Sequence, residues 1–293
     1  MLKKYLIKLN KKLKQRDQLK RLNHVPLFNT SILQQKKTSD TLFILGSSSS
    51  INDITNKQWE EIQSHDSIGL NRFLFHDTHN PTFYWYEFSN RFIYDYYVLE
   101  ELKKKLDYKD VPFIINFNSF QSTSLKLDVL PDQMRNNVMF FIPRVLKNYS
   151  KDTLIKELKD FPKNTSNIHY DSLLHVRGSI ATCVLIAWTL GYKKIVLPGV
   201  DLVNQDYFFY HTQNKNALNL KKWYGRLESY DNRFKTDGLH RTERDDLSKS
   251  FGMPSMTEYL VMIYDHLLNP HDCSLFAFSN QSLLARHFPV YEC

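Results

Sequence analysis

The segment Ser179–Asp201, with the sequence SIATCVLIAWTLGYKKIVLPGVD, decides the fold. Residues 180–190 are mostly apolar, and Gly191 stands where the left-handed residue after a helix is expected. Ile195–Leu197 is a short apolar run typical of a buried strand, and Pro198 and Gly199 end it. A helix that leads directly into a buried strand is the repeating unit of a parallel α/β sheet.

Six further short runs along the chain also predict strands, separated by polar or helical stretches. They are residues 41–45, 67–71, 82–86, 111–115, 138–142 and 274–278. This alternation predicts an α/β fold with a single doubly wound, mostly parallel, Rossmann-like sheet spanning residues 38–293. Residues 203–253 have no clear period, and such a long insertion predicts a lid or binding loop.

Small and polar residues follow several of these strands. Because ligands of such sheets bind beyond the carboxyl ends of the strands, we expect these residues to converge. They are Gly46, Ser47, Ser48, Ser49, Ser50, Asn71, Tyr86, Glu87, Gly199, Asp201 and Asn280. Asp201 is either a helix N-cap or a ligand contact.

The loop Gly46–Ser50 lacks both the three glycines of GxGxxG and a Walker lysine, which argues against ordinary dinucleotide and P-loop sites. Its hydroxyls and backbone N–H groups still suit a phosphate at a helix N-terminus; the alternative is a plain serine-rich turn. No strand ends in Asp-x-Asp, so the sequence supports no metal-dependent nucleotide-sugar site and no metal ligands.

Hydroxyl donors can replace a metal in stabilising a departing phosphate, and the insertion supplies candidates. They are Tyr207, Tyr210 and His211. Further along, the insertion also carries Arg233, Lys235, His240, Arg241 and Arg244. We interpret His240 as a general base, because imidazole titrates near neutral pH. The alternative is an exposed loop histidine.

Residues 1–37 form a basic amphipathic extension, with eleven Lys and Arg against one Asp, whereas the whole chain carries a net charge of +8. Three interpretations are open: a helix on an anionic membrane surface, a solvated extension, and nucleic-acid binding, which the nearly neutral body disfavours. Three cysteines without a CxxC motif indicate a reducing compartment, with Cys183 in the core. We therefore expect a cytoplasmic protein at the inner face of the plasma membrane.

Several segments, in order, resemble the small bacterial sialyltransferases of glycosyltransferase family 42. The loop 43–51 is similar to the family's Gly-Asn-Gly-Pro-Ser loop, and Gly69–Phe75 to its Cys-Asn-Gln-Phe-Tyr-Phe segment. Residues 178–201 resemble its Ser-Gly…Gly-Ile-Asp stretch, and Asp206–Thr212 its tyrosine-bearing lid. Gly238–His240 is similar to its Gly-His segment, and Asn280–Ala285 to its Asn-Ser-Leu-Leu-Ala close.

The resemblance implies a GT-A-like, metal-independent, inverting glycosyltransferase that uses a CMP-sugar donor and no further cofactor. Ser47–Ser49 would contact the nucleotide phosphate, Asn71 the CMP, and Ser179 the donor. Tyr207 and Tyr210 would assist departure of the phosphate, and His240 would deprotonate the acceptor hydroxyl.

Departures from the family pattern keep the sugar open. Trp85, Tyr86 and Glu87 stand where the family has an asparagine, and Glu87 is expected to bind either the acceptor or a differently substituted donor. The expected substrate contacts are Tyr86, Glu87 and Arg177. The expected donor is CMP-sialic acid, with CMP-Kdo, pseudaminate or legionaminate as alternatives. The expected acceptor is a glycan such as lipopolysaccharide or capsule, and a homo-oligomer is left open. A non-catalytic nucleotide- or glycan-binding protein is the alternative from another class.

Overall fold

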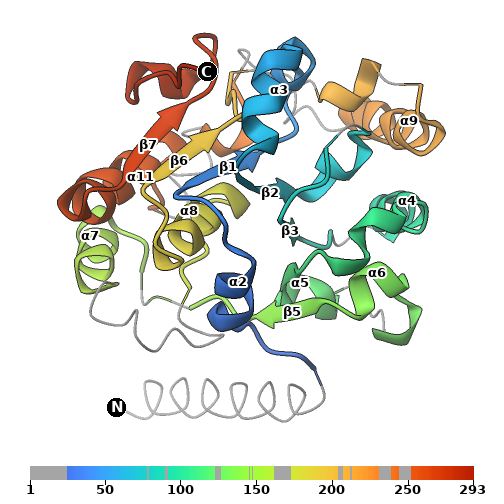
Figure 1. Cartoon of the computed structure of the whole chain (residues 1–293), viewed down its shortest axis with the longest axis horizontal. Helices are drawn as coiled ribbons and strands as arrows, with labels where there is room; N and C mark the ends of the chain where they lie inside the picture. The colour runs from blue at the N-terminus through green and yellow to red at the C-terminus, as the bar shows by residue number, and fades with distance from the viewer. Residues whose placement is uncertain are drawn as a thin grey trace.

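In the computed structural model, seven strands form one fully parallel sheet within the described part of the chain. The structure describes residues 25–77, 79–89, 92–122, 127–144, 146, 148–161, 173–203, 207–211, 213–230, 239–243 and 252–293. The strand order is β5-β4-β3-β2-β1-β6-β7. In Figure 1 the sheet runs from β7 at the upper left to β5 at the lower right.

The strands are short and lie close to their expected positions. They are β1 (Thr41–Leu45), β2 (Asp66–Leu70), β3 (Phe83–Tyr86), β4 (Phe113–Asn116), β5 (Val138–Phe141), β6 (Lys194–Leu197) and β7 (Ser274–Ala277). The longer helices are α2 (Thr30–Lys36), α3 (Asn56–Gln63), α4 (Phe92–Leu102), α5 (Phe117–Ser122), α7 (Lys151–Asp160), α8 (Ser179–Thr189), α9 (Lys215–Tyr230) and α11 (Met256–Ile263). Short turns of helix that matter here are η1 (Ser49–Asp53), η2 (Asn71–Phe75), α6 (Asp132–Arg135), η6 (Phe208–His211), η8 (Arg241–Glu243), η9 (Tyr264–Leu268), η10 (Asn269–His271) and η11 (Leu283–Arg286).

Helices cover both faces of the sheet, as a doubly wound fold requires (Figure 1). Leu42 and Ile44 of β1 join one apolar cluster with residues of α2, α7, α8 and α11. Phe43 and Leu45 point the other way, into a second cluster with residues of α3, α4, α5, α6 and α9. Every residue of β1 is buried, which explains why its sequence is a continuous apolar run. The predicted α/β class is confirmed.

The strand order reverses between β1 and β6, because strands two to five extend from one side of β1 and β6 lies on the other. The loops after these two strands meet there. Gly46 N–H donates to the Pro198 carbonyl oxygen at 2.8 Å, and Ser48 N–H to the Gly199 carbonyl oxygen at 3.0 Å. A crevice at such a reversal is the usual ligand site of open α/β sheets.

Gly46 and Gly199 are required by the close approach of these two loops. A Cβ at residue 46 would lie 2.1 Å from the carbonyl oxygen of Gly199, and one at residue 199 would lie 2.5 Å from the Ile51 side chain. Both glycines, expected as ligand contacts, therefore have a packing function in this structure.

Replacement of Gly46 by alanine should destabilise the protein by about 3 kcal/mol, at the upper end of the usual overpacking penalty. The matched change Gly191→Ala meets no atom within 4 Å, although its φ is +77°, and should cost only about 1 kcal/mol of backbone strain. Urea unfolding of both variants measures the difference. Equal stabilities would contradict the close approach of the two loops.

The carboxyl end of α8 has the expected glycine stop. Gly191 N–H donates to the Trp188 carbonyl oxygen at 2.9 Å, and Tyr192 N–H to that of Ala187 at 3.2 Å. This pair of bonds is the Schellman motif, and it turns the chain toward β6. The predicted helix-to-strand unit is therefore confirmed.

The predicted N-terminal extension, residues 1–37, is too long. Its C-terminal part belongs to the α/β body. Phe28 N–H donates to the Phe140 carbonyl oxygen at 2.8 Å, and Phe140 N–H to that of Pro26 at 2.8 Å. Phe28, which precedes α2, and Leu33 of α2 are buried in the core. Residues 26–28 thus cover the open edge of β5 and belong to the α/β body.

The predicted amphipathic helix at the N-terminus lies in residues 1–24, outside the described residues, and stays a prediction. None of the helices in the described segments combines the length and apolarity that a membrane crossing demands. Cys183 is buried in α8, as expected, and Cys273 is buried beside β7.

The insertion at 203–253 is not irregular throughout. It contains α9, a helix of 16 residues that packs Ala217 and Leu220 against the second apolar cluster. The sequence did not predict this helix, because its composition is mostly polar. The expected cations Arg233, Lys235 and Arg244 lie outside the described residues, and so does Gly238.

Candidate functional site

The loop after β1 is tied to the loop after β6 by serine side chains. Ser50 Oγ donates to Asp201 Oδ1 at 2.7 Å, and the N–H of Asp201 donates to Ser48 Oγ at 3.4 Å. These contacts fix the serine-rich loop beside the loop after β6, at the carboxyl end of the sheet. The sequence prediction that Gly46–Ser50 and Asp201 converge is confirmed.

The Asp201 carboxyl group joins these two loops through its hydrogen bond with Ser50, and it does not cap a helix. Burial raises the pKa of Asp201 above its ordinary value, although hydrogen bonds from the side chain and backbone of Ser50 oppose the shift. Its carbonyl oxygen accepts from Leu283 N–H at 2.8 Å. A ligand contact of Asp201 stays a prediction.

The tyrosine-bearing segment runs antiparallel beside the same loop. Ser48 pairs with Tyr207 in an isolated bridge, and Phe208 N–H donates to the Ser47 carbonyl oxygen at 3.1 Å. Tyr207 is half-buried, whereas the hydroxyl oxygen of Tyr210 is buried. The structure therefore brings Tyr207 to the edge of the serine loop, and Tyr210 packs behind it.

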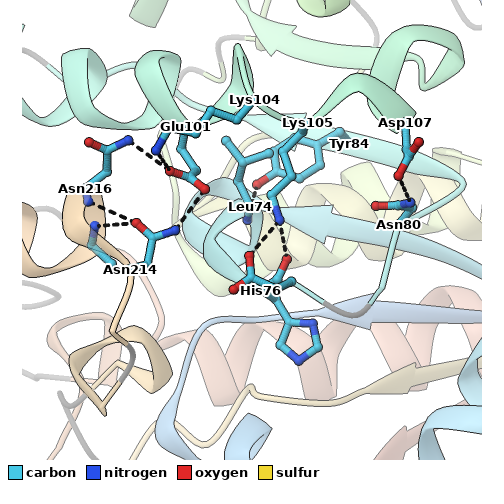
Figure 2. Close-up of polar contacts among 12 residues, drawn as sticks. Leu74, His76, Asn80, Tyr84, Glu101, Lys104, Lys105, Asp107, Asn214 and Asn216 are labelled. Carbon is cyan, nitrogen blue, oxygen red and sulfur yellow. Dashed lines mark hydrogen bonds and ion pairs between the residues drawn. The ribbon is translucent and has the colours of Figure 1, made fainter.

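A buried carboxylate fixes the chain that follows this segment. Glu101 of α4 is 3% exposed; it accepts from Asn214 Nδ2 at 2.8 Å, from Asn216 Nδ2 at 2.9 Å and from Lys104 Nζ at 3.0 Å (Figure 2). These bonds anchor the start of α9 to α4, so the tyrosine-bearing segment is held at both ends.

Asn71 ends β2 and orients two neighbouring elements. Its φ of +49° is a left-handed conformation that asparagine tolerates better than most residues. Its Oδ1 accepts from Glu87 N–H at 2.9 Å, and its Nδ2 donates to Ser179 Oγ at 3.4 Å. Asn71, Glu87 and Ser179 therefore meet at one point, as the sequence predicted.

The Glu87 carboxylate joins this point to α8 and to the segment before it. Ser179 Oγ donates to Glu87 Oε2 at 2.9 Å, and His175 Nε2 lies 3.2 Å from Glu87 Oε1. Burial by itself would raise the pKa of Glu87, but the hydrogen bond and charge of His175, the Ser179 hydroxyl and the charge of Arg72 together lower it. Glu87 is thus ionised at neutral pH.

Tyr86, expected as a substrate contact, is instead a core residue. It is 3% exposed, and its hydroxyl donates to Asp95 Oδ1 at 2.8 Å. The reason is strand alternation: Tyr86 joins the second apolar cluster, so its side chain points away from Trp85, which joins the first. The assignment of Tyr86 to the substrate site is therefore wrong in this structure.

Asp95 supports the backbone that carries Glu87, because it also accepts from Ser89 N–H at 3.1 Å. Burial raises the pKa of Asp95 from 3.8 to about 6, against the opposing effects of the Ser89 N–H, the Tyr86 hydroxyl and the Arg72 charge. Because the pKa of Asp95 is higher in the folded than in the unfolded protein, its protonated carboxyl group stabilises the fold at low pH. This stabilisation is lost as the pH rises through about 6.

As the pH rises from about 4 to 6, the free energy of unfolding of the wild-type protein should therefore fall by about 3 kcal/mol relative to that of the Asp95→Asn variant. Asparagine keeps an oxygen for the Tyr86 hydroxyl but cannot ionise. Chemical unfolding across this pH range measures the difference, with Asp40→Asn as a surface control, since the Asp40 side chain is 76% exposed. Parallel pH curves for wild type and Asp95→Asn would contradict the assignment.

His240 lies next to the loop after β6. Its N–H donates to the Leu202 carbonyl oxygen at 3.0 Å, and its Nδ1 lies 2.8 Å from Thr242 Oγ1. The Thr242 methyl group is 4.0 Å from the point that a Cβ on residue 178 would occupy. The turn that carries His240 therefore bridges Asp201–Leu202 and the N-terminus of α8.

Two other expected site residues have less support. Asn280 is exposed. In the same loop it is Ser282 that contacts the loop after β6, because its Oγ donates to the Val200 carbonyl oxygen at 2.8 Å. Arg177 is half-buried with a φ of +63° directly before Gly178, and its substrate contact stays a prediction. Within the described segments, no three His, Cys, Asp or Glu side chains gather closely enough to hold a metal ion.

Sequence reasoning missed several residues that shape the site. They are Arg72, His175, Thr182, Thr242 and Ser282. His175 stands only four residues before Ser179, so its proximity to that residue was the available signal. Arg72 belongs to the segment Gly69–Phe75, but its effect on Glu87 and Asp95 depends on how the fold brings these residues together.

The comparisons with known proteins give structural neighbours only. No family model matches the chain, and no curated protein matches it. An α-2,3-sialyltransferase from Campylobacter jejuni in apo form is 17% identical, with a TM-score of 0.44 over 87% of this chain and 82% of the neighbour. The sialyltransferase CstII from the same organism, in complex with cytidine monophosphate, is 16% identical, with a TM-score of 0.41 over 86% and 85%.

A third neighbour is the monofunctional α-2,3-sialyltransferase Cst-I from Campylobacter jejuni. It is 17% identical, with a TM-score of 0.43 over 92% of this chain and 83% of the neighbour. These solved proteins are bacterial sialyltransferases, the class that the sequence motifs resemble.

Proposed function

We propose that this chain is a metal-independent, inverting glycosyltransferase that moves sialic acid, or a related 2-keto sugar acid, from CMP to a glycan hydroxyl. The observation that carries the proposal is a series of hydrogen bonds and close neighbours around the strand ends near the sheet reversal. In order, it joins Tyr207, Ser48, Asp201, Leu202, His240, Thr242, Gly178, Ser179, Asn71 and Glu87.

This arrangement matches the chemistry of the transfer. The acceptor oxygen attacks the anomeric carbon, the bond from that carbon to the phosphate oxygen breaks, and CMP leaves with the electron pair. His240 takes the acceptor proton. Hydroxyl groups of Ser47–Ser49 and Tyr207, with backbone N–H groups of the loop, stabilise the charge that develops on the phosphate.

The proposal extends to the setting of the reaction. Acceptors would be cell-surface glycans such as lipopolysaccharide or capsule, which are built on lipid carriers. The cationic side chains of residues 1–24 would hold the enzyme at the anionic inner face of the membrane, at about 1 kcal/mol per cation. A cytoplasmic location is part of the same proposal, a homo-oligomer is left open, and nucleic acid is not among the expected partners.

The alternative donor is another CMP-activated 2-keto acid, such as Kdo, pseudaminate or legionaminate. The ionised Glu87 beside Ser179 favours a sugar that differs from the family's usual substrate in the groups it presents at this point.

The full-length protein should be incubated with CMP-N-acetylneuraminate or CMP-Kdo, with and without a lipid-linked oligosaccharide acceptor. Release of CMP that requires the acceptor supports the proposal, and the sugar that supports release identifies the donor. Tight binding of CMP with no release from either donor would identify a binding protein instead and overturn the proposal.

A further inference from the structure

The Glu87 carboxylate stands at the centre of a hydrogen-bonded cluster that the transfer chemistry above does not use. The cluster, called the Glu87 cluster below, consists of Asn71, Glu87, His175, Ser179 and Thr182. It lies at the carboxyl ends of β2 and β3, where they face the first turn of α8. Its proton arrangement determines which ligand groups it can bind.

Ser179 can only accept hydrogen bonds in this arrangement. Its single hydroxyl proton goes to Glu87 Oε2 at 2.9 Å. Its oxygen accepts from Asn71 Nδ2 at 3.4 Å, while the Asn71 oxygen is taken by the backbone N–H of Glu87. Ser179 therefore has no proton to give to a phosphate or a carboxylate while its bond to Glu87 persists.

His175 has a hydrogen-bonding partner at each ring nitrogen. The Thr182 hydroxyl donates to the Leu174 carbonyl oxygen at 3.1 Å, so His175 Nδ1 must be the donor in its 2.9 Å contact with Thr182 Oγ1. Nε2 faces a carboxylate at 3.2 Å, and a carboxylate only accepts. His175 Nε2 thus occupies one acceptor position of Glu87 Oε1, and Ser179 occupies one on Oε2.

The Glu87 side chain is partly exposed to solvent. Its side chain is 32% exposed, compared with 15% for the side chain of His175, and Ser179 is 9% exposed. An ionised carboxylate offers about four lone pairs, and the cluster uses one on each oxygen. The remaining acceptor capacity of Glu87 is therefore available at the strand ends, beside the site of the proposed reaction.

We infer that Glu87 is a specificity-determining residue that accepts a hydrogen bond from the transferred sugar, from a hydroxyl, amide N–H or ammonium group. This inference rests on the proposed function, because it assigns a partner to the sugar of the CMP donor. A second anion here would face an ionised carboxylate, so the phosphate and the carboxylate of the sugar must lie elsewhere along the strand ends.

A matched control exists on the same protein. Glu61 of α3 accepts from the Tyr291 hydroxyl at 2.9 Å and lies 3.2 Å from His65 Nε2, and its side chain is 35% exposed. It has the same kinds of partner at the same distances as Glu87. It lies beside His65, directly before β2, and so at the amino ends of the strands, away from the candidate site.

The test measures binding of CMP and of CMP-3FNeuAc, a substrate analogue, by calorimetry on wild type, Glu87→Gln and Glu61→Gln. Glutamine keeps the shape of glutamate but removes its charge. In Glu87→Gln the affinity for CMP-3FNeuAc should fall about tenfold, the value of a charge-assisted bond, while the affinity for CMP changes less than twofold. In Glu61→Gln neither affinity should change.

Three results overturn the inference. They are equal weakening of both ligands in Glu87→Gln, no weakening of either, and equal affinity of the wild-type protein for CMP and CMP-3FNeuAc. If Glu87→Gln does not fold, Glu87→Asp, which keeps the charge but is one methylene shorter, should also weaken CMP-3FNeuAc selectively. A wild-type protein that binds no CMP contradicts the proposed function itself, so the two failures are distinguishable.

Discussion

Replacement of His240 by alanine should reduce the rate of sugar transfer by about 10²–10⁴-fold, the usual contribution of a positioned general base. The turn that carries His240 is fixed by the Leu202 carbonyl oxygen on one side and by Thr242 on the other. Because the imidazole is half-buried at the surface of the site, its removal should leave the unfolding transition nearly unchanged. Initial rates and a thermal melt of the same preparation measure both effects.

His271→Ala is the control for this experiment. His271 is exposed and directly precedes β7, so it lies at the amino end of the sheet, opposite the site. It should retain the wild-type rate. A His240→Ala variant with near-wild-type turnover would contradict the assignment of the base.

Tyr207→Phe should slow transfer by about 10²–10³-fold, the usual effect of removing one hydrogen-bond donor to a developing negative charge. The backbone of Tyr207 pairs with that of Ser48, so this residue lies at the edge of the serine loop, and the proposed mechanism assigns its hydroxyl to the phosphate. The affinity for CMP should change little, because the donor matters most when charge builds on the phosphate. Single-turnover rates and calorimetric CMP binding separate the two effects.

Tyr210→Phe provides the comparison. The Tyr210 hydroxyl oxygen is buried, and the Lys221 ammonium lies 5.4 Å from the centre of its ring. We therefore expect a smaller loss of rate than for Tyr207→Phe. Equal rates for Tyr207→Phe and wild type would remove the tyrosine from the proposed mechanism.

Much of the fold follows from local sequence patterns. Thr41–Leu45 and Ile195–Leu197 are continuous apolar runs because strands at the centre of a parallel sheet are buried on both faces. Gly191 ends α8 because it takes the left-handed conformation required after a helix. Such signals depend on a few neighbouring residues, so the sequence alone predicts them.

The sequence could not predict contacts that depend on distant segments. Residues 26–28 read as part of a basic tail, and only pairing with Phe140 makes them part of the sheet. The helix α9 is polar over most of its length and is anchored by Glu101, more than 100 positions earlier in the chain.

The candidate site shows the same division. The convergence of Asn71 with Glu87 follows from the rule that parallel strands end at one edge of the sheet. The rule does not say which side chains at a strand end point into the core and which point to the site. Tyr86 follows the pleat into the core, whereas Glu87, one residue later, turns to the site.

Thermal unfolding of the wild-type protein with CMP, UDP or GDP, each with and without EDTA, tests most directly whether the strand-end site holds a cytosine nucleotide without a metal. CMP at 100 times its dissociation constant should add about 2.7 kcal/mol of stability, and EDTA should not change this gain. UDP and GDP should add much less. A shift that requires a divalent cation, or one as large with UDP or GDP as with CMP, would contradict the account.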